Sequence, residues 1–564
     1  MASLGQSSLR RFFARLTHMK NRVFKSLSVE KIELFLNSKW HNFDVSLLLI
    51  FGIIGLYTVA FSYFTILKYY AFRAFAWDLG IFNQAFWSTL HGKLFYSTIE
   101  LFIVPSGSFF GTHFSPILFL ILPIYAIYPA PETLLILQSF ILALGALPLC
   151  MLVRDSLNNK LASVVFVMTY LLYAPLHGVN WFDFHVQIFL PVFFLSAIYY
   201  LTKGKWLRYV FFTVLALAVA ENIAIIVVFV GVYCLWRFRH PLYNAISQKN
   251  LHDKRIFIPL ITIGLGISWF FAVRWIQGTF FPINPSFYQI YKALSNWAVL
   301  GVEGDPLKIP VYIIFHPMKV FEALSYDAYL KLVYIFLILG PLLFKSLRSS
   351  IIFITLAWFG PALLSNYPPY YLLGAHYPAY VIPFVFAAAV KALEKSFHHV
   401  QTPNFKGYLR NILVLGFLSS LFISPLSPLT LTSKTSLPYF SDYSIPTFTN
   451  HEALLQKAVN LVPPDASVLT HNNIFPHFSG RLDAYVYPLD WMIQRSTGDE
   501  MQNYIEDLFS KSDYVLTDKL SDPYATSLIL SRIQSVKDYG LYAYGDEIYL
   551  FKKHYLGDAI LLET

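Results

Sequence analysis

Long apolar runs recur along the first three quarters of the chain, and they constrain its fold more than any other feature. A helix needs about 20 apolar residues to cross about 30 Å of hydrocarbon, and the first run covers residues 45–67. The later runs lie at residues 132–153, 161–176, 188–202, 209–236, 256–277, 331–344, 350–364, 377–393 and 411–425. Hydrophobic residues make up 56% of the 564 residues and charged residues only 13%, against about 25% charged residues in ordinary soluble domains. The pattern predicts a polytopic membrane protein and excludes soluble, fibrous and disordered chains.

Basic residues between the apolar runs indicate how the chain is threaded. Residues 1–42 hold eight Lys and Arg residues and no signal-peptide cleavage site follows them, so they form a basic cytoplasmic N-terminal tail. With that start, most Lys and Arg residues of the later loops also fall on the cytoplasmic side. These residues form no continuous face despite a net charge of +10, so nucleic acid is not an expected partner. Cys150 and Cys234 lie in apolar runs and indicate neither a disulfide framework nor a zinc site.

The threading predicts a transmembrane domain over residues 43–426 with about eleven spans. Its first outer loop, residues 68–131, is large. Segment 114–129 contains three prolines, and the threading makes it a re-entrant or interfacial piece on the outer side. Segment 209–236 begins and ends on the cytoplasmic side. It is therefore expected to be a hairpin of two short helices that turns at Glu221-Asn222.

Residues 427–564 have shorter apolar runs and more charge, which predicts a soluble α/β domain. A Ser/Thr-rich stretch at residues 430–436 is its linker. The expected strands are Ala466–Thr470, Tyr514–Asp518 and Ile548–Lys552, and the expected helices are His451–Leu461, Asp499–Phe509 and Tyr524–Gln534. An odd number of spans places this domain outside the cell. The predicted fold class is thus mainly α, a helical bundle in the membrane with an extracytoplasmic α/β domain.

Ionisable residues near membrane depth are expensive, so each of them is a candidate for function. On the predicted topology they gather at the outer side, and they are Asp78, His113, Asp183, His185, Glu221, Arg274 and His376. Asp78 comes just before residues 81–90, which predict an interfacial helix. Acids together with a few cations at one interface suit a polar substrate that carries a phosphate.

Each candidate also has a structural interpretation. Asp78 could cap the helix that follows it, a common use of Asp. Asp183 and His185 point alike only in an extended loop, where they could share a metal ion or make loop hydrogen bonds. Glu221 could satisfy the backbone of the broken hairpin, and Arg274 could extend its charge to the outer interface.

The predicted outer domain has no Gly-x-Gly-x-x-Gly motif and no Ser–His–Asp arrangement, so we expect no chemistry of its own. Its candidate contact is segment 472–481, which follows the strand ending near Thr470, and ligands sit beyond the carboxyl ends of strands in open α/β sheets. If this segment binds the acceptor, His477 or Arg481 should face the cavity that holds Asp78. The alternative is that the two asparagines at its start cap a short helix and His477 packs locally.

Several stretches of the sequence together resemble a known family. They are Trp77–Trp87, His113–Leu118, Pro123–Tyr125, Leu134–Gln138, Glu221, Ala375–Tyr380, Ile382–Phe384 and Pro476–Arg481. They are similar to a prokaryotic, largely archaeal family of predicted integral membrane proteins of unassigned function. That family in turn resembles the GT-C superfamily of polytopic glycosyltransferases, so the resemblance implies a GT-C-like helical bundle.

The resemblance implies a membrane glycosyltransferase. It would transfer a sugar from a polyprenyl- or dolichyl-phosphate donor, a membrane lipid, to a glycan or protein acceptor at the outer face of the cell membrane. Asp78 matches the acidic position of the first outer loop and would be the general base.

The resemblance also implies roles for the other candidates. A cation must stabilise the departing phosphate, and Arg274 is the first choice, with His376 and His113 in reserve. Sugar hydroxyls or a divalent cation would be bound by Asp183, His185 and Glu221. The sequence has Asp-Phe-His at residues 183–185 in place of an Asp-x-Asp pair, so no metal ion is assigned.

Two other functions compete with the enzyme. The first is a non-catalytic protein that binds or transports lipid-linked glycans on the same scaffold. Paired broken helices of a secondary transporter would support transport, but the sequence indicates only one broken hairpin. In the second, the outer domain carries the function and the bundle only anchors it in the membrane. About eleven spans are excessive for an anchor, because one helix suffices.

Overall fold

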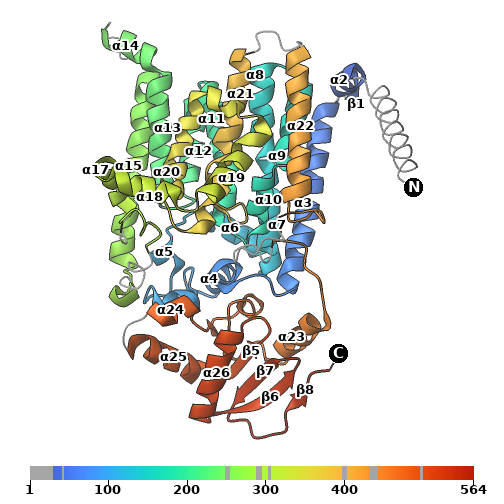
Figure 1. The fold of residues 1–564 in the computed structure, drawn as a ribbon, viewed down its shortest axis with the longest axis vertical. Helices are drawn as coiled ribbons and strands as arrows, with labels where there is room; N and C mark the ends of the chain where they lie inside the picture. The colour runs from blue at the N-terminus through green and yellow to red at the C-terminus, as the bar shows by residue number, and fades with distance from the viewer. Residues whose placement is uncertain are drawn as a thin grey trace, which may run out of the picture.

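The structure is a computed structural model that describes residues 29–40, 43–247, 254–287, 295–302, 306–396, 403–431, 443–495 and 499–563. Most of the predicted basic tail and most of the predicted linker at 430–436 lie outside these residues. The chain forms a helical bundle and, at one end of it, a smaller unit with a β-sheet, here called the sheet domain (Figure 1). The end of the bundle that contacts this unit is called the domain-facing end.

The bundle is built from helices that follow the apolar runs of the sequence. The first half of the chain forms α2 (Val29–Asn37), α3 (Val45–Tyr70), α4 (Ile81–Leu90), α5 (Phe109–Thr112), α6 (Leu118–Tyr125), α7 (Pro131–Leu144), α8 (Ala146–Leu157), α9 (Lys160–Leu171), α10 (Ala174–Trp181), α11 (Leu190–Thr202), α12 (Trp206–Leu217), α13 (Ile223–Arg237) and α14 (Arg239–Ser247). The rest forms α15 (Phe257–Phe280), α17 (Ile309–Phe315), α18 (Pro317–Ser325), α19 (Ala328–Leu339), α20 (Leu356–Leu363), α21 (Ile382–Ser396) and α22 (Pro403–Ile423). A two-stranded ribbon of β1 (Lys39–Trp40) and β2 (Phe43–Asp44) precedes α3.

Among the described residues, four helical segments are long and apolar enough to cross a membrane: α3, α7 with α8, α15 and α22. The number rises to six if the bent pairs α9–α10 and α18–α19 each count as one span. The expectation of about eleven spans is therefore not confirmed. The cause is length, because several apolar runs form helices of only 10–17 residues, and 17 residues rise only about 26 Å.

Several local predictions are confirmed. The helix expected over residues 81–90 is α4, with the same bounds. Segment 209–236 is broken between α12 and α13, and Glu221-Asn222 lies in that break. In segment 114–129 the apolar helix is only eight residues long and contains Pro123. This piece is too short to cross a membrane by itself.

Helix α21 lies in the core of the bundle. Eleven of its residues are buried, from Ile382 to Leu393, with three consecutive alanines among them. A helix that is apolar all round is stable only where other elements cover every face, and α21 is packed against α8, α11 and α19. Other helices of the bundle thus surround α21. The cavity described below lies at the domain-facing end of the bundle.

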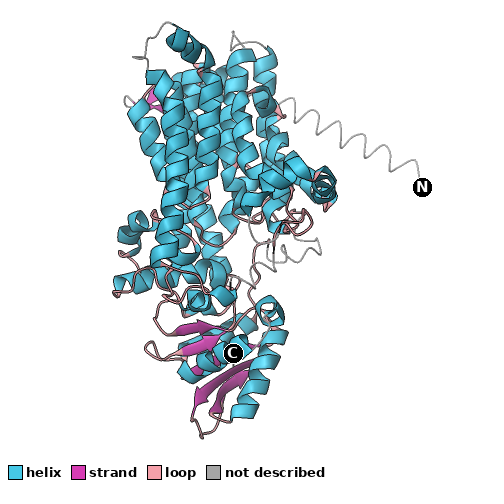
Figure 2. Cartoon of the chain, turned by 90° about the vertical axis from the view of Figure 1, so that its left-hand side faces the viewer, coloured by secondary structure: helices cyan, strands magenta, loops and turns pink. Residues whose placement is uncertain are grey.

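The sheet domain has six strands in the order β4-β3-β5-β7-β6-β8. They are β3 (Val468–Thr470), β4 (Ala484–Val486), β5 (Tyr514–Asp518), β6 (Tyr539–Gly545), β7 (Ile548–Lys553) and β8 (Ile560–Leu561), with helices α23 (Asn450–Asn460), α24 (Asp490–Arg495), α25 (Asp499–Lys511) and α26 (Pro523–Val536). Strand β3 pairs in parallel with β4 and β5, whereas β7 is antiparallel to β5 and β6. The three predicted strands and three predicted helices are all present within two residues of their expected bounds. Figure 2 shows the strands, in magenta, at the end of the molecule below the bundle.

Hydrogen bonds attach the sheet domain to the loop that follows α3. The amide of Ala76 donates to the backbone and side-chain oxygens of Asn472, at 2.8 and 3.0 Å. The side chain of Asn83 donates to the Ser479 hydroxyl at 2.8 Å. The amide group of Gln84 donates to two backbone carbonyls of the sheet domain at 3.0 and 3.3 Å. Because these groups are mostly buried, the loop and the sheet domain hold each other in place.

Candidate functional site

A cavity of about 640 Å³ lies where the domain-facing end of the bundle meets the sheet domain. Five of the candidates from the sequence line it: Asp78, His113, His185, Glu221 and His376. The sheet domain contributes Asn472, Leu489 and Trp491. Among the described residues, no Lys or Arg lines this cavity. Its polar wall is therefore made of carboxylates, imidazoles and amides.

Asp78 lies in a short π-helical turn, Ala76–Gly80, directly before α4. No side-chain capping bond is made at the start of this turn or of α4, so the capping alternative for Asp78 is wrong. Its Oδ1 lies 3.3 Å from Nε2 of His185. Burial, reinforced by the charge of Asp183 and opposed by that of Lys68, raises the pKa of Asp78 to about 8.

The contacts of His185 determine where the proton of this pair lies. Nδ1 of His185 is 2.9 Å from the backbone carbonyl of Asp183, so Nδ1 carries a hydrogen and donates it. Burial lowers the pKa of His185 to about 4, which leaves its Nε2 as an acceptor at neutral pH. Burial likewise favours the neutral, protonated form of Asp78. The pair is a carboxylic acid whose Oδ1 lies 3.3 Å from Nε2 of a neutral imidazole.

His376 lies directly against this pair. Its ring stacks on that of His185 with a centroid distance of 4.1 Å and an angle of 13°. Nδ1 of His376 is buried and has no hydrogen-bond partner among the described residues. Burial holds the pKa of His376 well below its usual range, so the ring is neutral. A buried polar atom without a protein partner is uncommon and indicates a ligand or water.

Asp183 does not face the cavity and instead holds the loop that carries Asp78. Its Oδ1 pairs with Nζ of Lys68 at 2.6 Å, and its Oδ2 accepts the backbone N–H of Phe75 at 2.6 Å. Asp183 and Lys68 are 3% and 5% exposed, so the pair is almost completely shielded from solvent. An extended loop could have let Asp183 and His185 share a metal ion. In the structure the two side chains contact different partners.

His113 and Glu221 form a second pair on the cavity wall. Nδ1 of His113 lies 3.0 Å from Oε1 of Glu221, and Oε2 of Glu221 accepts the backbone N–H of Phe114 at 3.2 Å. Burial alone would lower the pKa of His113, but the charge and hydrogen bond of Glu221 and the charge of Glu100 outweigh it and raise the pKa. Glu221 thus favours the protonated form of His113. The backbone group that Glu221 accepts belongs to Phe114 and not to the broken hairpin, so this contact differs from the one predicted for Glu221.

Glu100 is 1% exposed and lines the same cavity, but it is not among the site residues predicted from the sequence. It lies in a turn of 3₁₀-helix, Thr98–Phe102, and its Oε2 accepts the hydroxyl of Thr112. Burial raises the pKa of Glu100 to about 7, against the opposing effects of Thr112 and His113. An isolated acid between apolar residues in the same outer loop was the available signal.

Besides Asp183, three further candidates lie away from the cavity. Arg274 is exposed on α15 and its guanidinium lies 5.8 Å from the ring centroid of Phe270. His477 stacks on Tyr69 and Phe72, at 4.3 and 4.0 Å between ring centroids. The Arg481 side chain donates to two backbone carbonyls of its own domain, at 2.9 and 2.7 Å.

The outer-domain residues expected to face Asp78 thus pack locally instead, because the turn after β3 points His477 back at α3. Asn472, from the same segment, is the residue that reaches the cavity. No group of three or more His, Cys, Asp or Glu side chains in the described part of the chain could hold a metal ion. Asp183, His185 and Glu221 do not converge, so they do not fit a shared divalent cation.

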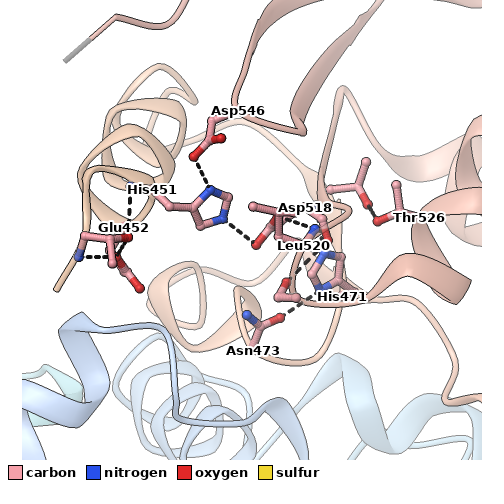
Figure 3. Close-up of polar contacts among 11 residues, drawn as sticks. His451, Glu452, His471, Asn473, Asp518, Leu520, Thr526 and Asp546 are labelled. Carbon is pink, nitrogen blue, oxygen red and sulfur yellow. Dashed lines mark hydrogen bonds and ion pairs between the residues drawn. The ribbon is translucent and has the colours of Figure 1, made fainter. Parts of the chain in front are cut away.

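A second cavity of about 420 Å³ lies beside the first, and Phe75 and Asn472 line both. Figure 3 shows its polar cluster, in which His451 lies between Asp518 and Asp546 at 3.0 and 2.8 Å. Burial alone would lower the pKa of His451, but the hydrogen bonds to the two carboxylates outweigh it and raise the pKa. This cluster ties α23 to β5 and to the turn between β6 and β7. We therefore assign it a structural role.

Two solved structures align with most of the chain. The crystal structure of ArnT from Cupriavidus metallidurans in the apo state has a TM-score of 0.41 and 12% sequence identity, covering 84% of this chain and 93% of that chain. The crystal structure of the Archaeoglobus fulgidus oligosaccharyltransferase in the apo form has a TM-score of 0.34 and 12% identity, covering 91% of this chain and 75% of that chain. No curated protein matches the chain significantly. Residues 68–550 match the family described as predicted membrane protein (DUF2079), so the family resemblance of the motifs is confirmed and the chain belongs to DUF2079.

Proposed function

We propose that this protein is a membrane glycosyltransferase that transfers a sugar from a polyprenyl- or dolichyl-phosphate donor to a glycan or protein acceptor. The observation that supports this most is the Asp78–His185 pair, which lies on the wall of a cavity of about 640 Å³ at the end of an apolar bundle. A lipid-linked donor reaches such a site from the membrane, whereas a nucleotide sugar stays in the cytoplasm. The motif resemblance to GT-C enzymes agrees with this assignment.

The proposed orientation has the basic tail in the cytoplasm and the sheet domain outside the cell, with the cavity at the outer membrane surface. It follows from the distribution of Lys and Arg residues along the sequence. The acceptor then approaches from outside, next to Asn472 and Trp491. The donor lipid approaches from the side of the bundle.

In the proposed reaction the acceptor hydroxyl attacks the anomeric carbon of the donor sugar, and the phosphate leaves with the electrons of the broken bond. Asp78 in its ionised form is the general base that takes the hydroxyl proton. With a pKa of about 8, only a minor fraction of Asp78 is ionised at neutral pH, and this fraction grows as pH rises. Nε2 of His185, 3.3 Å from Oδ1, is placed to accept a hydrogen bond from the carboxyl once Asp78 has taken the proton.

The departing phosphate needs a positive partner. Arg274 is exposed outside the cavity, so the proposal moves this role to His113 and His376, the reserve candidates, which line the cavity. Of the two, His113 is the one whose protonated form is favoured, because Glu221 raises its pKa. His376 offers an unpartnered ring nitrogen that can share a proton with the phosphate.

A non-catalytic protein that binds lipid-linked glycans is the second candidate function. One observation favours it: no Lys or Arg among the described residues lines the cavity, so a leaving phosphate meets only imidazoles. Such a protein would hold the same donor through the same wall. It would not need Asp78 to lose its proton.

The test compares the purified wild type with Asp78→Asn, using labelled dolichyl-phosphate sugars and a panel of acceptors. The Asn amide can still donate to Nε2 of His185, so the cavity keeps its geometry but loses its base. We expect donor binding to persist and transfer to fall about 10²- to 10⁴-fold. For the wild type, kcat/KM should rise with pH and level off above about pH 8.

Asp155→Asn is the matched control, because this carboxylate pairs with Lys203 away from the cavity. Equal transfer by Asp78→Asn and the wild type would refute the assignment of the base. Donor binding without transfer by the wild type, with every acceptor, would establish the binding protein instead.

A further inference from the structure

Glu100 is a carboxylate that the proposed reaction leaves unused, although it lines the cavity. Its residue is 1% exposed, and its Oε2 accepts the Thr112 hydroxyl. Its Oε1 is buried and has no hydrogen-bond partner among the described residues. Burying a carboxylate oxygen without a partner costs free energy, so this oxygen marks a place where a ligand can supply a donor.

The surroundings of Glu100 show which ligand chemistry fits. The charge of His113 acts on Glu100, but His113 is already bonded to Glu221 at 3.0 Å. Oε1 of Glu100 itself would repel the donor phosphate, which the proposed reaction places at His113 and His376. An apolar lipid chain would leave Oε1 of Glu100 unpaired. A neutral group that donates hydrogen bonds suits it best.

Other unpartnered polar atoms lie on the same cavity surface. The Ser115 hydroxyl and Oε1 of Gln187 are buried without partners among the described residues, and both side chains line the cavity. Gln187 donates through Nε2 to the Tyr380 hydroxyl at 3.3 Å, and Asn222, next to Glu221, donates to the same hydroxyl at 2.9 Å. Gln187 is thereby connected to the wall that holds Glu221.

We propose that Glu100, Ser115 and Gln187 form a subsite that binds the ring hydroxyls of the donor sugar. This inference deepens the proposed function, because it places the sugar on the Glu100 wall, with the anomeric carbon directed at Asp78. All three groups present an oxygen that can accept a hydrogen bond, and a sugar ring carries several hydroxyl donors. Glu100 is a specificity-determining residue here, since it touches the sugar and takes no part in the proton transfer.

The test measures binding, so that it does not depend on catalysis. Dissociation constants are measured for dolichyl phosphate and for a panel of dolichyl-phosphate hexoses and pentoses, with the wild type and Glu100→Ala. The wild type should bind at least one sugar-bearing lipid more tightly than dolichyl phosphate. In Glu100→Ala the dissociation constant for that lipid should rise about 10- to 100-fold. Binding of dolichyl phosphate itself should stay within about twofold. The proposed subsite would be refuted if Glu100→Ala bound both kinds of lipid more weakly by the same factor, or bound both as tightly as the wild type does.

Glu100→Gln provides a second measurement if the Ala variant fails to fold. Gln resembles the neutral acid in shape and cannot ionise. The wild type should bind the sugar-bearing lipid more tightly as pH rises from 6 to 8, since the ionised Glu100 is the stronger acceptor, and Glu100→Gln should lose that part of the pH dependence. His113, Glu221 and Asp78 also titrate near the ligand, but they are unchanged in this comparison.

Glu132→Gln is the matched control, since this carboxylate bonds Tyr70 on the bundle surface and does not line the cavity. It should behave as the wild type at every pH. A pH dependence that is identical in Glu100→Gln and the wild type would refute the inference. A wild type that binds sugar lipids through Glu100 but transfers nothing would refute the proposed function and leave the subsite intact.

Discussion

The buried pair of Lys68 and Asp183 allows a prediction with a definite magnitude. Asp183 bonds Nζ of Lys68 through one oxygen and the N–H of Phe75 through the other, both at 2.6 Å. Asp183→Asn leaves the Lys68 charge in a site that is 5% exposed. Breaking a buried pair from one side costs about 3–5 kcal/mol. Since 1.4 kcal/mol is a factor of ten, opening of the segment before Asp78 should become more than about a hundredfold more frequent.

Hydrogen exchange measured by mass spectrometry checks this on the peptide covering residues 71–80. We expect the amide of Phe75 to exchange about a hundredfold faster in Asp183→Asn than in the wild type. The double variant Lys68→Met/Asp183→Leu removes both charges, so its thermal stability should return close to that of the wild type. The Phe75 amide should nevertheless remain unprotected, because no acceptor has replaced the carboxylate.

Asp155→Asn is the control, because its partner Lys203 is 43% exposed and a surface pair contributes about 0–1 kcal/mol. Exchange and thermal stability should be nearly unchanged in that variant. Unchanged exchange at residues 71–80 in Asp183→Asn would refute the view that Asp183 holds the loop that carries Asp78.

Three further predictions concern the packing around the site. A Cβ at Gly178 would lie 1.8 Å from the carbonyl oxygen of Leu373, so Gly178→Ala should destabilise the protein by about 1–3 kcal/mol in thermal unfolding. His451→Gln should remove a pH dependence of sheet-domain stability. The raised pKa of His451 contributes stability that is complete below the unfolded pKa of about 6.5 and is lost as pH rises through the folded value. Gln84→Ala leaves the carbonyl of Arg481 without this donor and leaves that of Ala484 with only the Thr98 hydroxyl, so proteolysis between the bundle and the sheet domain should accelerate.

Each of these predictions has its own control. Gly264→Ala has open space around the new methyl group, so its unfolding temperature should match the wild type. His554→Gln should keep the pH dependence that His451→Gln loses, and a pH dependence that survives in His451→Gln would contradict the assignment. For Gln84→Ala, proteolysis at the wild-type rate would show that the domain contact does not depend on this amide.

The sequence predicts the position of most elements but not how they cross the membrane. Strand β5 and helix α4 have their expected bounds because turn residues and apolar periodicity define them locally. The span count fails because a continuous apolar run does not reveal the bends, such as the 45° bend between α9 and α10. The apolar pattern indicates which residues are shielded from water. A bent helix and a straight helix can have the same pattern, so the pattern does not distinguish them.

For the candidate site, the sequence indicates which end of the bundle is polar, but not which side chains meet. Asp78 and His185 are 107 positions apart, and only tertiary packing brings them to 3.3 Å. Lys68, the partner of Asp183, lies at the end of an apolar helix where it resembles an ordinary interfacial lysine. Glu100 was missed because a single acid in a loop carries no spacing pattern.

The contact between the first loop and the sheet domain has a consequence for how the protein is made. The cavity wall contains residues from Phe75 to Trp491, so a growing chain carries Asp78 long before the opposite wall exists. At about 5–20 residues per second, roughly 20 to 80 s separate the two events during synthesis. Until Asn472 is made, the N–H of Ala76 in this loop lacks the backbone and side-chain oxygens of Asn472 that later accept it. The nascent chain therefore lacks one wall of the cavity, and a premature stop before the sheet domain leaves the cavity open on that side.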